Sequence, residues 1–200
     1  AMAEAADIAL DDVEVDLVLV SPNDPGAMLR HTQECRDRGV PFAADPSQTL
    51  TFLDGEAIRS LVTGATYLFT NEYEAGLVHA KTGWSDADVL ELVQTRVTTH
   101  GAKGVVVQRK GEPDLHVGVV PAEVVADPTG VGDGFRAGFL TGIAWGLDLE
   151  RACQVGATLA THVVETVGPQ EYHVTRDGFL SRLAGAYGEA AADEVAPHLS

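Results

Sequence analysis

The sequence predicts an α/β fold in which helices cover a mostly parallel sheet. Over the first half of the chain, short β-rich runs alternate with helical stretches, which is the pattern of parallel strands joined by helical crossovers. Two further β-rich runs flank a turn-forming segment that contains Gly111 and Pro113, and this indicates a hairpin. From Gly130 onward the pattern is helical. With 200 residues and no internal repeat or linker, these observations predict one domain over residues 1–200.

Local signals set the expected bounds of each element. Gly39 is a natural stop for the first helix, and Ser85 with the acidic residues after it is typical of a helix N-cap. The predicted strands span residues 16–20, 40–44, 66–69, 104–108 and 115–120. The predicted helices span residues 27–39, 56–62, 72–82, 85–94, 133–146, 149–165 and 176–195.

The charge balance argues against two classes of partner. The chain carries 13 Lys+Arg and 30 Asp+Glu, a formal net charge of −17. A field of this sign repels the phosphate backbone of nucleic acids and anionic lipid surfaces. We therefore expect no nucleic-acid partner and no membrane partner. An anionic small-molecule substrate remains compatible, because backbone N–H groups and a bound cation reverse the field locally.

Targeting and redox signals are sparse. No run approaches the roughly 18 apolar residues of a membrane span, and residues 1–12 are acidic rather than basic, so we expect no signal peptide. Cys35 and Cys153 are the only cysteines and lack a CxxC spacing, so we expect two reduced, buried thiols and a cytoplasmic location. The seven histidines lack zinc-ligand spacing, so no protein-held zinc is expected.

The most informative segment runs from Asp127 to Phe135 and reads Asp-Pro-Thr-Gly-Val-Gly-Asp-Gly-Phe. It is a glycine-rich turn that opens a helix, where free N–H groups and the helix dipole favour an anion such as a transferring phosphoryl group. Gly130 and Gly132 let the backbone approach that anion without an intervening Cβ. Asp133 would stay ionised there and could accept a proton from an attacking hydroxyl. The simpler interpretation is an Asp-capped helix after a glycine turn.

This segment resembles the C-terminal motif of the ribokinase-like (PfkB) family of sugar and nucleoside kinases, an Asp-[Thr/Pro]-Thr-Gly-Ala-Gly-Asp run. The resemblance implies a three-layer α/β/α sandwich. It also implies an anion hole at Gly130, Val131 and Gly132, the catalytic base at Asp133, and nucleotide binding by Thr129. Val131 stands where the family has Ala, a change that removes no chemical group. Independently of the family, the small residues 137 and 138 on the next turn predict close packing of this helix against the sheet.

Two further segments match the family in order and spacing. Residues 71–74, Asn-Glu-Tyr-Glu, match an Asn-x-x-Glu motif, which implies that Asn71 and Glu74 lie near the ATP phosphates and that Glu74 organises the water shell of Mg²⁺. Alone, this motif is an ordinary Asn N-cap. Residues 98–104 match the segment that receives the phosphates and ribose of ATP, which implies that Thr99, Gly101 and Gly104 bind the nucleotide. Alone, that segment is a turn between two strands.

The resemblance implies ATP and Mg²⁺ as cofactors, with a monovalent cation such as K⁺ as a further candidate. Mg²⁺ would arrive with ATP and keep several waters. Asp127 is either a metal-site carboxylate near these cations or a turn-forming residue before Pro128. Arg136 either reaches an ATP phosphate or is a surface arginine.

Five further segments carry a narrower resemblance: residues 42–48, 67–71, 81–85, 116–121 and 182–189. They resemble one branch of the family, the actinobacterial adenosine kinases, so the similarity extends over nearly the whole chain. It implies that residues 154–160 and 121–125 line the adenine pocket. The chain begins at a point that resembles an interior position of such kinases. We therefore expect the acceptor-binding Asp, its Gly-Gly pair, several N-terminal strands and the β lid to be missing from this sequence. The strand at 16–20 would then lie at an exposed sheet edge, which favours self-association as a homodimer.

Three hypotheses for function follow. The first is transfer of the γ-phosphoryl group of ATP to the 5′-hydroxyl of a nucleoside, as by an adenosine kinase of purine salvage. The second is a sugar kinase acting on ribose or fructose. The third is a catalytically incomplete nucleotide-binding fragment. Turnover separates the third hypothesis from the others, and a panel of acceptors separates the first two.

Overall fold

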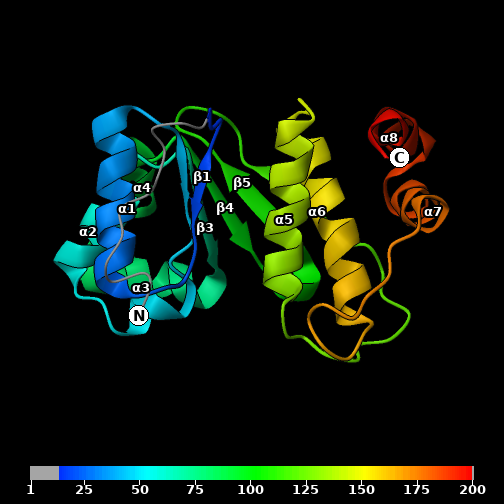
Figure 1. The fold of residues 1–200 in the computed structure, drawn as a ribbon, viewed down its shortest axis with the longest axis horizontal. Helices are drawn as coiled ribbons and strands as arrows, with labels where there is room; N and C mark the ends of the chain where they lie inside the picture. The colour runs from blue at the N-terminus through cyan, green and yellow to red at the C-terminus, as the bar shows by residue number, and fades with distance from the viewer. Residues whose placement is uncertain (1–13, 200) are drawn as a thin grey trace. The chain divides into compact units, whose positions relative to one another are not determined.

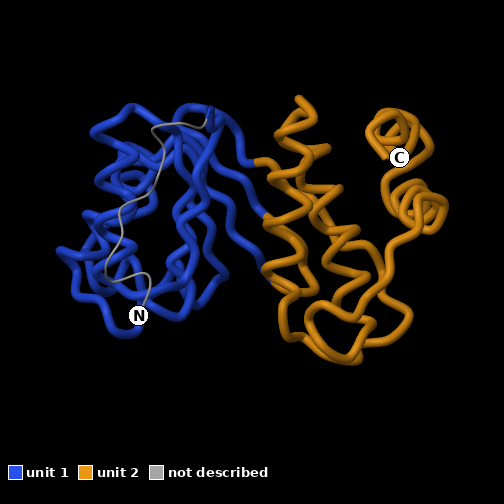
Figure 2. The backbone as a smooth tube through the Cα atoms, viewed as in Figure 1, with its two compact units in different colours: residues 1–100, 106–114 blue, residues 101–105, 115–200 orange. Residues whose placement is uncertain are grey.

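The computed structural model describes residues 14–199. Its six strands form one sheet whose order follows the chain, β1-β2-β3-β4-β5-β6. The described residues form two compact units (Figure 2): unit 1 comprises residues 14–100 and 106–114, and unit 2 comprises residues 101–105 and 115–199.

Unit 1 is built from parallel strands joined by helices (Figure 1). Its parallel strands are β1 (Val18–Val20), β2 (Phe42–Ala44), β3 (Tyr67–Asn71) and β4 (Thr95–Thr99). The connecting helices are α1 (Pro25–Arg38), the 3₁₀ turn η1 (Ser47–Thr51), α2 (Gly55–Val62), α3 (Glu72–Thr82) and α4 (Asp86–Leu92). The crossovers are long enough for the parallel pairing that the alternating pattern predicts.

The apolar core of unit 1 lies between these strands and helices. Phe42 and Leu68 from the sheet are buried with Ile58 of α2, Val78 of α3 and Val89 of α4 in one cluster. Burial of these side chains is the main driving force for the folding of the unit. The same core fixes where the carboxyl ends of the strands lie, and the predicted site residues of unit 1 follow those ends.

The hairpin prediction concerns β5 (Val105–Gln108) and β6 (Leu115–Val117), which are neighbours in the strand order. They are joined by residues 109–114, a connection too short for a parallel crossover. The predicted hairpin is therefore the arrangement that fits this connection.

Unit 2 is mainly helical. Its helices are η2 (Gly101–Lys103), α5 (Val131–Ala144), α6 (Leu149–Val164), α7 (Arg176–Tyr187), α8 (Glu189–Val195) and η3 (Ala196–His198). Figure 1 shows α5 and α6 side by side. A Cβ at Gly138 of α5 would lie 2.8 Å from the Cα of Gly156 in α6. The prediction that residues 137 and 138 pack on the sheet is wrong, because Gly138 contacts α6 and Ala137 is exposed.

Most elements differ from the predicted bounds by one to three residues, and three differences have identifiable causes. Helix α1 begins at Pro25 rather than residue 27, because Asp24 caps it and proline is favoured at the first helical position. The predicted helix 176–195 is two helices, because Gly188, with φ of 92°, ends α7. Strand β4 received no predicted bounds.

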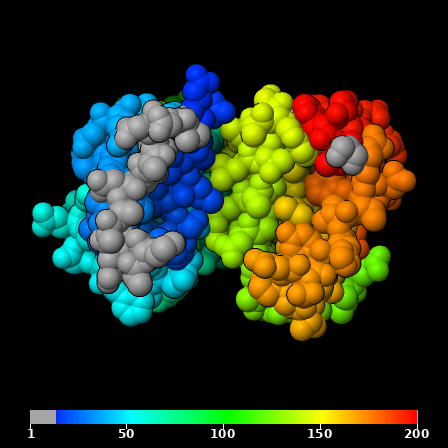
Figure 3. Space-filling view, viewed as in Figure 1, coloured from blue at the N-terminus to red at the C-terminus, as the bar shows by residue number. Residues whose placement is uncertain are grey.

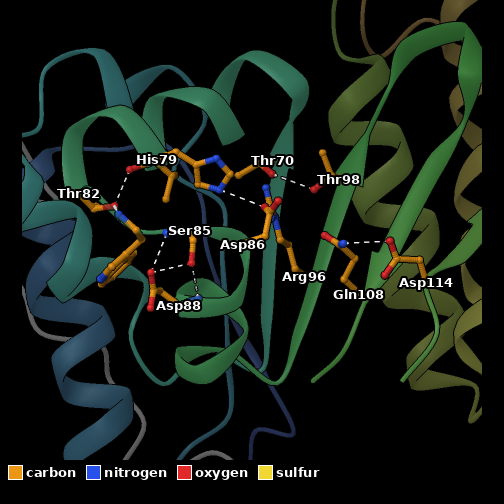
Figure 4. Close-up of polar contacts among 12 residues, drawn as sticks. Thr70, His79, Thr82, Ser85, Asp86, Asp88, Arg96, Thr98, Gln108 and Asp114 are labelled. Carbon is orange, nitrogen blue, oxygen red and sulfur yellow. Dashed lines mark hydrogen bonds and ion pairs between the residues drawn. The ribbon is translucent and has the colours of Figure 1, made fainter. Parts of the chain in front are cut away.

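Strand β4 is hard to predict because its buried residues are mostly polar. Thr95, Arg96 and Thr98 are all buried. Figure 4 shows the partners of two of them: Arg96 donates to Asp86, and the hydroxyl of Thr98 lies 3.4 Å from that of Thr70 on β3. Partners from other elements thus make a polar run compatible with a central strand.

Other expectations concern exposure. Cys35 and Cys153 are both free and buried, as predicted. Strand β1 lies at one end of the six described strands, as predicted for the 16–20 segment. Among the helices formed by residues 14–199, none is both long and apolar enough to cross a bilayer. Residues 1–12, on which the signal-peptide expectation rests, lie outside the described residues.

Candidate active site

The glycine-rich turn opens α5 in the manner that anion binding requires. Gly130 is the N-cap residue, with φ of 80°, and it contributes no side-chain cap. The first intrahelical hydrogen bond runs from the Gly134 N–H to the Gly130 carbonyl at 2.8 Å. The N–H groups of Gly132 and Asp133 precede that bond and point along the positive end of the helix dipole. An anion placed at this turn would meet backbone donors.

Asp127 fastens this turn from two sides. Its Oδ1 accepts the Thr129 N–H at 2.8 Å, and its Oδ2 accepts the Gly168 N–H at 3.2 Å. The hydrogen bonds from Thr129, followed by the one from Gly168, hold the pKa of the Asp127 carboxyl below its ordinary value. Of the two roles predicted for Asp127, the structure shows the turn-forming one. Its metal role stays a prediction.

Gly130 is confined by the segment that Asp127 reaches. A Cβ at Gly130 would lie 2.6 Å from the Cβ of Pro169. The connection around Pro169, residues 166–175, is orange in Figure 3 and lies at the surface of unit 2. Both the positive φ and this contact therefore require glycine at position 130.

Asp133 lies in the first turn of α5, with 77% of its side chain exposed. It forms an ion pair with Arg136, whose side chain is only 15% exposed. Gly132 leaves room for this pair, since a Cβ there would lie 3.2 Å from Nη1 of Arg136. Arg136 is thus the partner of Asp133, a role that was not among the two predicted for it. An accessible carboxylate held beside a cation can act as a base toward a bound hydroxyl.

In unit 1, the Asn-x-x-Glu motif forms a capping box at the start of α3. The Asn71 Oδ1 accepts the Glu74 N–H at 2.9 Å, and the Glu74 Oε2 accepts the Asn71 N–H at 2.8 Å. This is the N-cap interpretation that the residues alone favoured. The nucleotide and Mg²⁺ roles of Asn71 and Glu74 stay predictions.

The sheet register brings Asn71 and Thr99 together. They are partner residues at the carboxyl ends of the parallel strands β3 and β4. In open α/β sheets, ligands bind at this edge of the sheet. Next to them, Nδ1 of His100 lies 3.0 Å from Oε1 of Glu72. His100 belongs to the predicted 98–104 segment, but its contact with Glu72 was not predicted, since it depends on the register of β3 and β4.

Glycines of the 98–104 segment have clear backbone roles. Gly101 and Gly104 have φ of 55° and 95°. A Cβ at Gly104 would lie 2.1 Å from the carbonyl oxygen of Val117. Glycine at 104 is therefore required by the fold, and the ATP-binding role of both glycines stays a prediction.

The predicted site residues are divided between the two units. Asn71, Glu74 and Thr99 belong to unit 1. Gly101, Gly104 and the 127–133 segment belong to unit 2. Across residues 14–199, no group of three His, Cys, Asp or Glu side chains could hold a metal ion.

The two segments predicted to line an adenine pocket lie in unit 2. Residues 121–125 are exposed, and residues 154–160 lie within α6, where most are buried. Gly156 faces Phe135 of α5, and Val155 belongs to the apolar cluster with α7. Their contact with a nucleotide stays a prediction.

Comparison with known proteins identifies the family. The chain matches the pfkB family of carbohydrate kinases over residues 3–176. The nucleoside kinase of Methanocaldococcus jannaschii is 31% identical over 168 residues, which cover 84% of this chain and 55% of the relative. The ribokinase of Bacillus subtilis is 29% identical over 171 residues, with coverage of 84% and 56%. The chain thus spans a little over half the length of these relatives.

Solved structures agree. The nucleoside kinase of Burkholderia thailandensis in complex with inosine has a TM-score of 0.85 and 36% identity, covering 89% of this chain and 59% of its own. The M. jannaschii enzyme, described as an archaeal member of the ribokinase family, has a TM-score of 0.81 and 30% identity, covering 87% and 57%. These matches confirm the ribokinase-like α/β fold. The chain belongs to the pfkB carbohydrate kinase family.

Proposed function

We propose that this chain carries the phosphoryl-transfer machinery of a nucleoside kinase. The reaction would move the γ-phosphoryl group of ATP to the 5′-hydroxyl of a nucleoside such as adenosine or inosine. The observation that carries the proposal is the start of α5, where the exposed carboxylate of Asp133 lies beside uncapped N–H groups. A base and an anion site at one helix terminus are what this chemistry needs.

Each group has a defined task. Asp133 accepts the proton of the hydroxyl as its oxygen bonds to the γ-phosphorus and the bond to the ADP oxygen breaks. The N–H groups of Gly132 and Asp133 stabilise the charge on the transferring group. Arg136 orients the Asp133 carboxylate through their ion pair. Mg²⁺, when bound with ATP, would neutralise phosphate charge.

Partners and cations complete the proposal. Glu74 and Asp127 would contact the hydrated cations through water, because each carboxylate already accepts a backbone N–H. K⁺ would lie near Asp127. The β1 edge would carry a homodimer contact, since an edge strand offers unpaired backbone groups.

Two relatives favour a nucleoside acceptor, and one favours a sugar. The M. jannaschii and B. thailandensis proteins are nucleoside kinases. The B. subtilis protein is a ribokinase, so ribose is the second candidate acceptor.

The test is MgATP-dependent phosphorylation of adenosine, inosine, ribose and fructose by the chain and by Asp133→Asn. Asp177→Asn is the matched control, since Asp177 lies in the first turn of α7 and is also exposed. We expect nucleoside turnover that Asp133→Asn reduces by at least about 10³-fold, with MgATP affinity largely kept. Asp177→Asn should behave like the parent chain.

Other outcomes point elsewhere. Turnover of ribose alone would replace the nucleoside by the sugar acceptor. Binding of MgATP without turnover of any acceptor would identify a nucleotide-binding fragment. Loss of MgATP binding in Asp133→Asn would give Asp133 a structural role and count against its assignment as the base.

A further inference from the structure

The segment that leads into the anion-binding turn is held by the end of α6. Residues 121–126 are exposed and form no helix or strand. The Glu123 N–H donates to Oε1 of Glu165 at 2.7 Å, and the N–H groups of Ala126 and Asp127 donate to the Val164 carbonyl at 2.8 and 3.2 Å. With so little buried surface in the segment, these hydrogen bonds determine its position.

Glu165, which accepts the hydrogen bond from the Glu123 N–H, is itself held by α7. Nη2 of Arg182 lies 2.6 Å from Oε2 of Glu165, and both side chains are largely buried, at 25% and 13% exposure. The hydrogen bond from Arg182 lowers the pKa of Glu165, and the same bond raises the pKa of Arg182. The Glu165 carboxylate therefore stays ionised and bridges Arg182 to the backbone of Glu123.

Apolar packing keeps Arg182 in reach of Glu165. Phe179 and Leu183 of α7 are buried with Val155 of α6 in one cluster. The His162 ring, one turn before Glu165, stacks on Phe179 with centroids 6.1 Å apart. Burial, then the charge of Arg182, lowers the pKa of His162, so the positive charge facing Glu165 at neutral pH comes from Arg182.

We propose that Arg182 and Glu165 are positioning residues for nucleotide binding: they fix residues 121–127 and so hold Asp127 and the Gly130 turn ready for phosphate. The inference rests on the proposed function for its ligand. The chain path supports it, since Glu123 precedes Asp127 by one short stretch and Asp127 fastens the turn through Thr129 and Gly168. Preorganised donors bind an anion better than donors that must first be ordered.

The experiment compares Arg182→Met and Arg182→Lys with Arg151→Met. Arg151 is the matched control, because it joins α6 to α8 in the same unit through an ion pair with Glu194 at 2.9 Å. Three quantities are measured on each chain: the melting temperature, amide hydrogen exchange at residues 123, 126 and 127, and the Kd for MgATP.

Arg182→Met should raise amide exchange at residues 123–127 and weaken MgATP binding by about tenfold, the scale of one charge-assisted hydrogen bond. Arg182→Lys should restore most of the affinity, because it keeps the charge beside Glu165. Arg151→Met should lower the melting temperature by a similar amount without either effect. Glu165→Ala, which removes the acceptor, should reproduce Arg182→Met.

The inference is overturned if Arg182→Met matches Arg151→Met in amide exchange, whatever the nucleotide result. It is also overturned if amide exchange rises in Arg182→Met but this variant and Arg151→Met bind MgATP with about the same Kd. A parent chain that binds no MgATP would instead overturn the proposed function, and the nucleotide part of this inference with it. Exchange at residues 123–127 requires no nucleotide, so the two failures are distinguishable.

Discussion

Gly130 combines two constraints, a left-handed backbone and a close neighbour. Its φ is 80°, and a Cβ would lie 2.6 Å from Pro169. Gly111 shares only the first constraint, with φ of 76° and no other described atom within 4 Å of its Cβ position. Alanine substitutions at Gly111 and Gly130 therefore distinguish the free-energy cost of the left-handed backbone from the cost of a steric clash.

Gly111→Ala should lower the free energy of unfolding by about 1 kcal/mol, the cost of the left-handed region. Gly130→Ala should cost about 3 kcal/mol, because the clash with Pro169 adds to that strain. Urea denaturation of both variants measures the difference. Equal costs would show that the Gly130 turn moves away from Pro169 freely, contrary to its description as a confined turn.

At the scale of elements, α5 and α6 approach closely along a row of glycines. A Cβ at Gly138 would lie 2.8 Å from the Gly156 Cα and 3.0 Å from the Val155 carbonyl oxygen. A Cβ at Gly142 would lie 2.8 Å from the Ala152 Cα. These neighbours are backbone atoms, so the helices would have to separate to admit a methyl group.

Gly138→Ala should therefore destabilise the protein, although alanine gains about 1 kcal/mol over glycine in a helix. We expect overpacking to exceed that gain and to leave a net loss of about 1–2 kcal/mol. The control is Gly185→Ala in α7, where no other described atom lies within 4 Å of the added methyl group. Gly185→Ala should stabilise the protein by up to about 1 kcal/mol. Thermal unfolding that shows the same sign for both would contradict the close α5–α6 contact.

At the scale of the whole molecule, each unit contains an ion-paired carboxylate that becomes protonated at low pH. Arg96 lowers the pKa of Asp86 in unit 1, and Arg182 lowers the pKa of Glu165 in unit 2. A depressed folded-state pKa contributes stability above the unfolded-state pKa and loses it as pH falls through the folded-state pKa. Both units should thus lose stability in acid.

We expect the free energy of unfolding to change little from these groups between pH 7 and about pH 5, and then to fall below about pH 4.5. Trp84 in unit 1 and Trp145 in unit 2 are the two tryptophans, so single-tryptophan variants report each unit separately by fluorescence. Arg96→Met should reduce the loss of unfolding free energy at acid pH that Trp84 reports. Arg182→Met should reduce the corresponding loss that Trp145 reports. An unchanged slope in either variant would remove that ion pair as a source of acid sensitivity.

Several predictions from sequence succeeded because their signals are local. The start and end of α3 at residues 72 and 82 match the predicted bounds, since Asn71 caps one end and Gly83 the other. The turn at Gly130 and the helix after it follow from glycine spacing within a few residues.

Predictions failed where the deciding contact is distant along the chain. The packing of Gly138 depends on Gly156, and the burial of Arg96 depends on Asp86 in another element. The break at Gly188 was missed because the apolar pattern of the last helices continues across it.

By itself, the sequence determined the α/β pattern, the pfkB motif and the position of Asp133 in the first turn of a helix, because each depends on neighbours along the chain. Only the tertiary structure decided that Thr99 is the partner of Asn71 and that Arg182 holds the segment before the turn through Glu165. The physical reason is that side-chain rotamer, strand register and helix packing are settled only when distant segments are buried together.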